Sequence, residues 1–163
     1  MKIFLKENCN IKKLNINDFF ATKKIISQVM KLYQKKSTSL KKNEKIIKQG
    51  ISEIIINAIE HGAIGLGSQK KYELKRKGIY ETYLNNVISN CNKSIDVEYV
   101  EEKNNITLII SDFGNGFEWK KHLIAVETKK DGTGLWLAKN SFDELTYNTT
   151  GNSAKAVVYK DAY

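Results

Sequence analysis

Glu53 and Asn57 are polar side chains, four residues apart, in a segment that is otherwise rich in isoleucine. On a helix this spacing places both on the same side, with His61 one turn further along. The Asn57 amide oxygen is a hard ligand that suits Mg²⁺, and the Glu53 carboxylate can accept the proton of a hydroxyl or water that attacks a γ-phosphate. Taken alone, the pair is explained more simply as the solvated side of an amphipathic helix.

Asp112 ends a segment of alternating residues and is followed by Gly114 and Gly116. Its carboxylate can accept a hydrogen bond from the exocyclic amine of adenine, and the glycines allow the chain to bend closely around the base. An ordinary strand-to-loop turn would contain the same residue types. Taken alone, this segment therefore does not indicate a nucleotide site.

Gly132-Thr133-Gly134 precedes a segment with helical spacing. Glycines at the start of a helix let backbone N–H groups approach phosphate oxygens, and the N-terminus of a helix favours an anion. Lys129 and Lys130 would add positive charge over the phosphates. The alternative is that the glycines only break the chain before a helix.

Two other candidate sites fail on their residues. Gly62 and Gly67 have the spacing of a P-loop, but Ser68 and Gln69 stand where Lys and Ser/Thr are required. The two histidines have no cysteine or carboxylate at a spacing that would complete a metal site. We therefore expect neither a Walker A loop nor a histidine metal centre.

The elements that must position these residues follow from periodicity. Apolar residues at three- and four-residue steps predict a first helix from 17 or 18 to the lysine-rich 35–42 and a second helix from 43 to 61 that Gly62 stops. The same spacing predicts a more polar helical region at 68–90 with a break near Gly78, and a last helix at 134–141. Alternation predicts a hairpin of strands at 95–99 and 106–111, strands at 145–148 and 154–159, and a short edge strand at 2–6. The segment 113–131 lacks sustained periodicity and contains a candidate helix at 119–126, and we expect it to behave like a mobile lid. Helices early and antiparallel strands late predict an α+β protein with helices on one face of a mixed sheet.

Composition limits the classes of function. A chain of 163 residues with 41% hydrophobic content can bury one ordinary core, so we expect one domain. The net charge of +9 favours anionic partners, but Arg76 is the only arginine, which argues against DNA readout. Two distant cysteines without a signal peptide indicate a reduced, cytoplasmic protein, and no apolar run approaches the length of a membrane span.

The order and separation of the three segments resemble those of the GHKL-type ATPases. Glu53 to Gly62 is similar to the N box, Asp112 to Gly116 to the G1 box and Gly132 to Gly134 to the G2 box. Within that superfamily the chain resembles most the bacterial anti-sigma-factor serine/threonine kinases, on the residues after the G2 box: Phe142-Asp143-Glu144-Leu145, Tyr147-Asn148 and Gly151-Asn152. It departs from many of them at Thr133, where they have arginine.

The resemblance implies a two-layer α/β sandwich, the Bergerat fold, over residues 1–163, with a helical insertion at about 63–92 and an ATP lid at about 113–133. It implies Glu53 as the general base, Asn57 as the Mg²⁺ ligand and Asp112 as the adenine acceptor. The remaining nucleotide-binding residues that it implies are Ala58, His61, Gly114, Gly116, Phe117, Lys130, Gly132, Thr133, Gly134 and Leu135.

The function implied is an Mg-ATP-dependent serine/threonine protein kinase that transfers the γ-phosphate to a small anti-sigma antagonist. A sigma factor as second partner and a homodimer are further implications. The main alternative is an adaptor that binds ATP without transferring phosphate and sequesters a partner according to its nucleotide state. A basic nucleic-acid-binding domain is a third possibility, whose affinity would fall steeply with salt.

Overall fold

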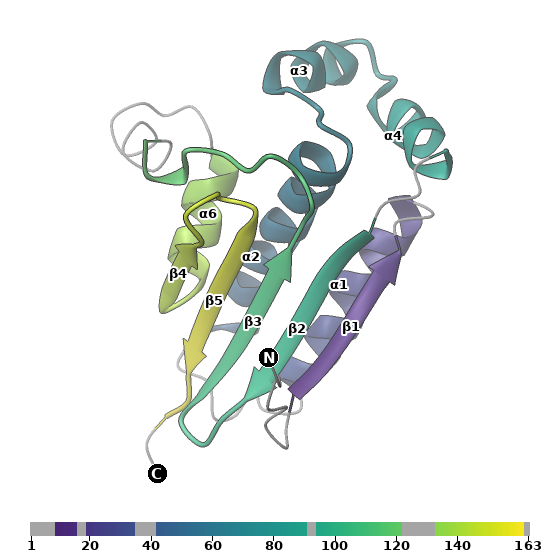
Figure 1. Ribbon diagram of the computed structural model, residues 1–163. Coiled ribbons are helices and arrows are strands. Elements are labelled where there is room, and N and C mark those ends of the chain that lie inside the picture. The colour runs from purple at the N-terminus through teal and green to yellow at the C-terminus, as the bar shows by residue number, and fades with distance from the viewer. Residues whose placement is uncertain (1–8, 16–18, 35–41, 91–93, 122–132, 162–163) are drawn as a thin grey trace, which may run out of the picture.

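An antiparallel sheet forms one layer of the protein (Figure 1). The computed structural model describes residues 9–15, 19–34, 42–90, 94–121 and 133–161. Within these ranges the strand order is β1 (Cys9–Asn15), β2 (Ser94–Glu101), β3 (Asn105–Ser111), β5 (Ser153–Tyr159) and β4 (Glu144–Tyr147). All of these neighbours pair antiparallel, so the prediction of a mixed sheet is wrong for the described strands. Two of the pairs are hairpins, and the longer connections also reverse the chain direction.

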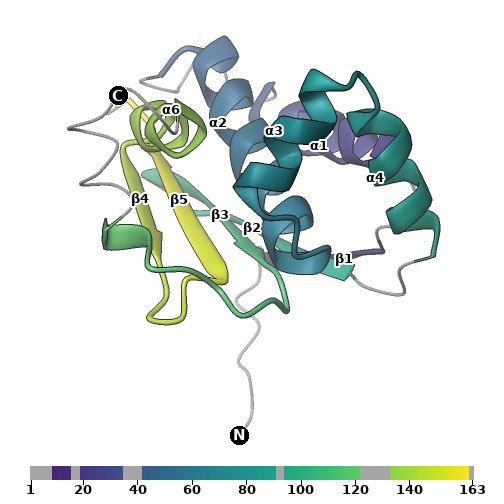
Figure 2. The same cartoon turned by 90° about the horizontal axis from the view of Figure 1, so that it is seen from above.

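Helices form the second layer. Their bounds are α1 (Phe19–Gln34), α2 (Glu44–Asn57), η2 (Ala58–Ala63), α3 (Ser68–Arg76), α4 (Tyr80–Ser89) and α6 (Thr133–Ser141). Figures 1 and 2 show α1, α2 and α6 against one face of the sheet, while α3 and α4 extend beyond the strand ends. The prediction of an α+β protein with helices on one face of the sheet is confirmed.

The core lies between the two layers, because alternate strand residues face the helices. Ile106 and Leu108 are fully buried on β3, and Ile51 and Ile55 are fully buried on α2. The predicted apolar stripe of α2 is buried except for Ile46, which remains 46% exposed. Successive residues are rotated by about 100° around the helix axis, so Ile46 lies on a different side of α2 from the buried Ile47. Side-chain capping begins this helix, since Asn43 accepts a hydrogen bond from the Lys45 N–H at 2.8 Å.

The structure adds one strand that was not predicted and corrects one predicted boundary. Residues 9–15, which carry a weak pattern, form the edge strand β1 by pairing with β2, and the predicted strand at 2–6 lies outside the described residues. Gly62 does not stop the second helix, since the π-helical turn η2 continues through Ala63. The glycine serves a different purpose there, because a Cβ on Gly62 would overlap the side chain of Asp112.

The helical insertion has the predicted break. Gly78 lies between α3 and α4 and has a φ of +68°, a left-handed conformation that glycine adopts without strain. Of the predicted helix at 119–126, residues 119–121 are helical and the rest lies outside the described residues. No helix in the described ranges has the length and apolarity needed to cross a bilayer.

Candidate functional site

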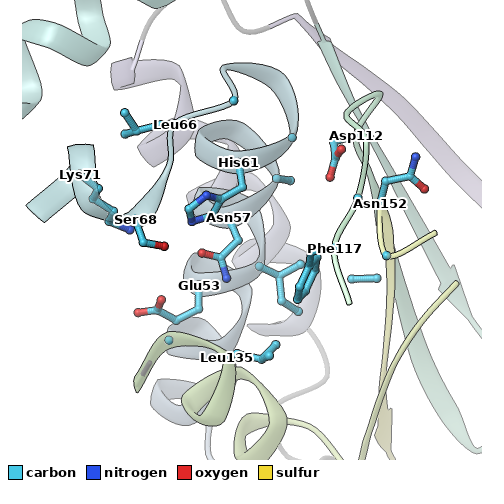
Figure 3. Close-up of a pocket in the computed structure, with 18 of the residues that line it drawn as sticks. Glu53, Asn57, His61, Leu66, Ser68, Lys71, Asp112, Phe117, Leu135 and Asn152 are labelled. Carbon is cyan, nitrogen blue, oxygen red and sulfur yellow. The ribbon is translucent and has the colours of Figure 1, made fainter. Parts of the chain in front are cut away.

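A cavity of about 810 Å³ lies between α2, α3, the start of α6 and the loops that follow β3 and precede β5. Three distant sequence segments meet there (Figure 3). Nine predicted site residues line it: Glu53, Asn57, Ala58, His61, Asp112, Gly116, Phe117, Gly134 and Leu135. Gly114 packs against Gly62 instead, and Lys130, Gly132 and the side chain of Thr133 lie outside the described parts of the structure.

Glu53, Asn57 and His61 form one wall of the cavity. Figure 3 shows the three side chains on the same side of α2 and η2, as their spacing predicts. Glu53 and Asn57 are half-buried, and His61, on the π-helical turn, is exposed. Single π-helical turns often occur at functional sites. An amide oxygen and a carboxylate oxygen are thus presented together to the cavity.

The start of α6 lies against the Glu53 carboxylate. A Cβ on Gly134 would stand 2.5 Å from Glu53 Oε2, which is closer than any ordinary contact. Only glycine therefore allows this approach without displacing the glutamate. Gly134 of the G2-like segment and Glu53 of the N-box-like segment are therefore in close contact.

Asp112 forms the opposite end of the cavity, where its side chain lies close to Gly62 of η2 (Figure 3). Its Oδ1 accepts a hydrogen bond from the Gly114 N–H at 2.8 Å, and its own N–H donates to the Asn152 carbonyl at 2.9 Å. Burial raises the pKa of the Asp112 carboxyl above its ordinary value, although the Gly114 N–H and the nearby His61 act in the opposite direction.

The loop after Asp112 is fixed to the turn between β4 and β5. The Phe117 N–H donates to the Thr150 carbonyl at 3.1 Å, and the Phe117 and Tyr147 rings meet edge to face at 5.2 Å. Gly116, at a φ of +72°, packs so closely on Thr150 that a Cβ would overlap its carbonyl. The first residues of the predicted lid at 113–133 therefore form a fixed wall, and residues 122–132 lie outside the description.

Asn148 shapes the turn that receives this loop. Its Oδ1 accepts hydrogen bonds from the N–H groups of Gly151, Asn152 and Ser153 at 2.8, 3.0 and 3.2 Å. Asn152 in turn donates from Nδ2 to the Gly114 carbonyl at 3.1 Å. One asparagine side chain thus positions the residues that hold the chain beside Asp112.

Several lining residues were not predicted from the sequence. They come from the insertion, from the end of β4 and from the turn before β5, and include Leu66, Ser68, Lys71, Tyr72, Lys75, Tyr147, Gly151 and Asn152. Ser68 appeared in the sequence only as a residue that breaks the P-loop pattern. The Gly151-Asn152 pair was visible as part of the family resemblance, and the lysines of α3 gave no signal beyond a charged helix.

The donor set suits a magnesium ion more than a metal held by protein alone. No group of three or more His, Cys, Asp or Glu side chains that could enclose a metal occurs in the described part of the chain. Mg²⁺ usually takes one or two protein oxygens and fills its other positions with water and substrate phosphates. The Asn57 amide oxygen beside the Glu53 carboxylate meets that requirement.

The chemistry of the cavity therefore changes along its length. A carboxylate acceptor lies at one end, an amide and a second carboxylate lie on the α2 wall, and Lys71 of α3 lies beyond them (Figure 3). Such an arrangement suits an elongated ligand with a hydrogen-bond donor at one end and negative charge at the other.

No protein-family model matches the chain, and no curated protein matches it.

Proposed function

We propose that this cavity binds Mg-ATP and that the protein is a GHKL-type kinase with the Bergerat fold, of the anti-sigma serine/threonine type. One observation carries the proposal: residues of the N-box-like, G1-like and G2-like segments line a single cavity. The helix layer over an antiparallel sheet is compatible with that fold. The N-box-like segment ends at Gly62, 50 positions before Asp112, so a chance match of short motifs would have no reason to bring these segments together in space.

The proposal gives three of the lining residues a chemical role. Asp112 accepts a hydrogen bond from the adenine amine, since its Oδ1 already takes the Gly114 N–H and its other oxygen remains an acceptor. Asn57 provides an oxygen to Mg²⁺, which offsets the charge of the phosphates. Glu53 accepts the proton of the attacking hydroxyl as the new bond to the γ-phosphorus forms and ADP leaves.

The resemblance suggests a small anti-sigma antagonist as the phosphate acceptor, a sigma factor as second partner and a homodimer as the assembly. The net charge of +9 is consistent with an acidic partner. A cytoplasmic location fits the same set of partners.

Phosphate transfer from labelled ATP tests the proposal. The protein is incubated with Mg²⁺ and candidate antagonists, and Glu53→Gln is compared with Glu73→Gln, an exposed glutamate of α3 that does not line the cavity. We expect label on a serine or threonine of the antagonist, loss of label in Glu53→Gln with ATP affinity retained, and no change in Glu73→Gln. A wild-type protein that binds no ATP would refute the nucleotide site.

The close contact between Glu53 and the start of α6 favours a second candidate, the non-catalytic adaptor. In that case the carboxylate positions α6 against α2 and accepts no proton. The adaptor would bind ATP, transfer no label to any antagonist, and release or capture its partner when ATP replaces ADP. Partner binding measured with each nucleotide distinguishes the two functions.

A further inference from the structure

Glu60 is a fully buried carboxylate that the proposed function does not use. It lies on η2 with no exposed surface, and its Oε2 forms an ion pair with the Lys71 ammonium of α3. Its other oxygen, Oε1, has no hydrogen-bond partner among the described residues. A buried charge is costly unless it is paired, so the Glu60 carboxylate holds the Lys71 ammonium beside it.

Lys71 connects this buried carboxylate to the cavity. Its side chain keeps 25% of its surface exposed and lines the cavity together with Ser68. Figure 3 shows both residues on the side of Glu53 and His61, away from Asp112. If adenine lies at Asp112, this side of the cavity receives the phosphates.

The ammonium has donors to spare. It carries three N–H groups and no acceptor, and the ion pair with Glu60 uses one of them. The others are available to oxygen atoms of a ligand in the cavity. The neighbouring lysines of α3 are arranged differently, since Lys70 lies over the Tyr83 ring at 4.9 Å and Lys75 over the Tyr80 ring at 5.1 Å.

We infer that Lys71 is a phosphate-binding residue of the nucleotide site, and that residues 65–75 of the insertion supply the wall of that site beside the phosphates. The inference rests on the proposed nucleotide function and adds a specific contact to it. A fixed cation at this position contacts phosphate oxygens of ATP and has nothing to contact in adenosine. Lys71 therefore sets the preference of the site for a phosphorylated ligand.

The test must separate phosphate binding from a purely structural ion pair. Removal of Lys71 alone would leave Glu60 buried and unpaired, and the single variant risks unfolding. The double variant Glu60→Gln with Lys71→Met removes both charges together and keeps two side chains of similar size. Lys70→Met is the matched control, because it removes a neighbouring charge of α3 that does not line the cavity.

Calorimetric titration of the full chain with ATP and with adenosine, in Mg²⁺ at constant ionic strength, gives the result. We expect the double variant to raise the Kd for ATP about tenfold, as for one charge-assisted hydrogen bond, and to change the Kd for adenosine by less than about twofold. Lys70→Met should change neither value.

Two results would overturn the inference. Unchanged ATP affinity in a folded double variant would mean that the pair is structural only, and equal losses for ATP and adenosine would mean that the cavity itself had changed. A wild-type protein that binds neither ligand would instead refute the nucleotide site itself, and the role of Lys71 with it.

Discussion

The substitution Asp112→Asn tests the adenine end of the cavity by reversing one hydrogen-bonding group. Asp112 Oδ1 is committed to the Gly114 N–H at 2.8 Å. An asparagine keeps its oxygen at that donor and so turns its NH₂ group toward the cavity. The adenine amine also donates, so two donors would then face each other.

The magnitude follows from the kind of bond that is lost. A hydrogen bond to a charged acceptor contributes about 1.5–3 kcal/mol, so the Kd for ATP should rise about 10- to 100-fold. Inosine triphosphate carries an oxygen acceptor in place of the amine, which the asparagine NH₂ can satisfy. The preference for ATP over inosine triphosphate should therefore fall or reverse.

The stability of the unliganded protein should change in the opposite direction to ATP affinity. Burial raises the pKa of Asp112, so the stability that this group contributes is present below its ordinary pKa and is lost as the pH rises through the higher folded pKa. At neutral pH the ionised carboxylate is a cost that Asp112→Asn removes. The variant should be at least as stable as the wild type at pH 7 and should lose this advantage in acid.

Titration calorimetry with both nucleotides and thermal unfolding from acid to neutral pH provide the measurements. Asp143→Asn is the control, since its Oδ2 accepts the Tyr159 N–H and it does not line the cavity. An unchanged preference between the two nucleotides in Asp112→Asn would refute the assignment of Asp112 to the base.

Three further tests address the metal ligand, the core and the loop. Asn57→Ala should abolish the Mg²⁺ dependence of ATP binding in calorimetry with and without the metal, and a retained dependence would remove Asn57 as a ligand. Ile51→Ala, at a fully buried position, should lower the free energy of unfolding by about 2–5 kcal/mol in urea, whereas a loss below about 1 kcal/mol would contradict its packing. Gly116→Ala and Gly65→Ala both place a side chain at positive φ, but only the Gly116→Ala side chain would overlap the Thr150 carbonyl. In urea denaturation, Gly65→Ala should lower the free energy of unfolding by roughly 1 kcal/mol, and Gly116→Ala should lower it by clearly more. Equal losses would contradict the close contact between Gly116 and Thr150.

Local patterns in the sequence predicted most of the secondary structure. The isoleucine repeat predicted α2, the alternation at 95–99 and 106–111 predicted the β2–β3 hairpin, and Gly78 marked the break between α3 and α4. These elements depend on neighbours within a few residues of one another, which periodicity records. The edge strand β1 was missed because its partners are distant: Cys9 pairs with Val100, and residues 9–15 alternate too weakly to reveal it.

The sequence alone determined which side chains share a helix side and which residue types the site contains, as for Glu53 and Asn57. Only the tertiary structure decided which of these residues meet. Gly62 against Asp112, Gly134 against Glu53 and Lys71 beside Glu60 each join segments whose separation follows from strand order and from the path of the insertion. The physical reason is that backbone geometry fixes side-chain direction over one or two turns, whereas contacts between distant segments depend on how the whole chain buries its apolar surface.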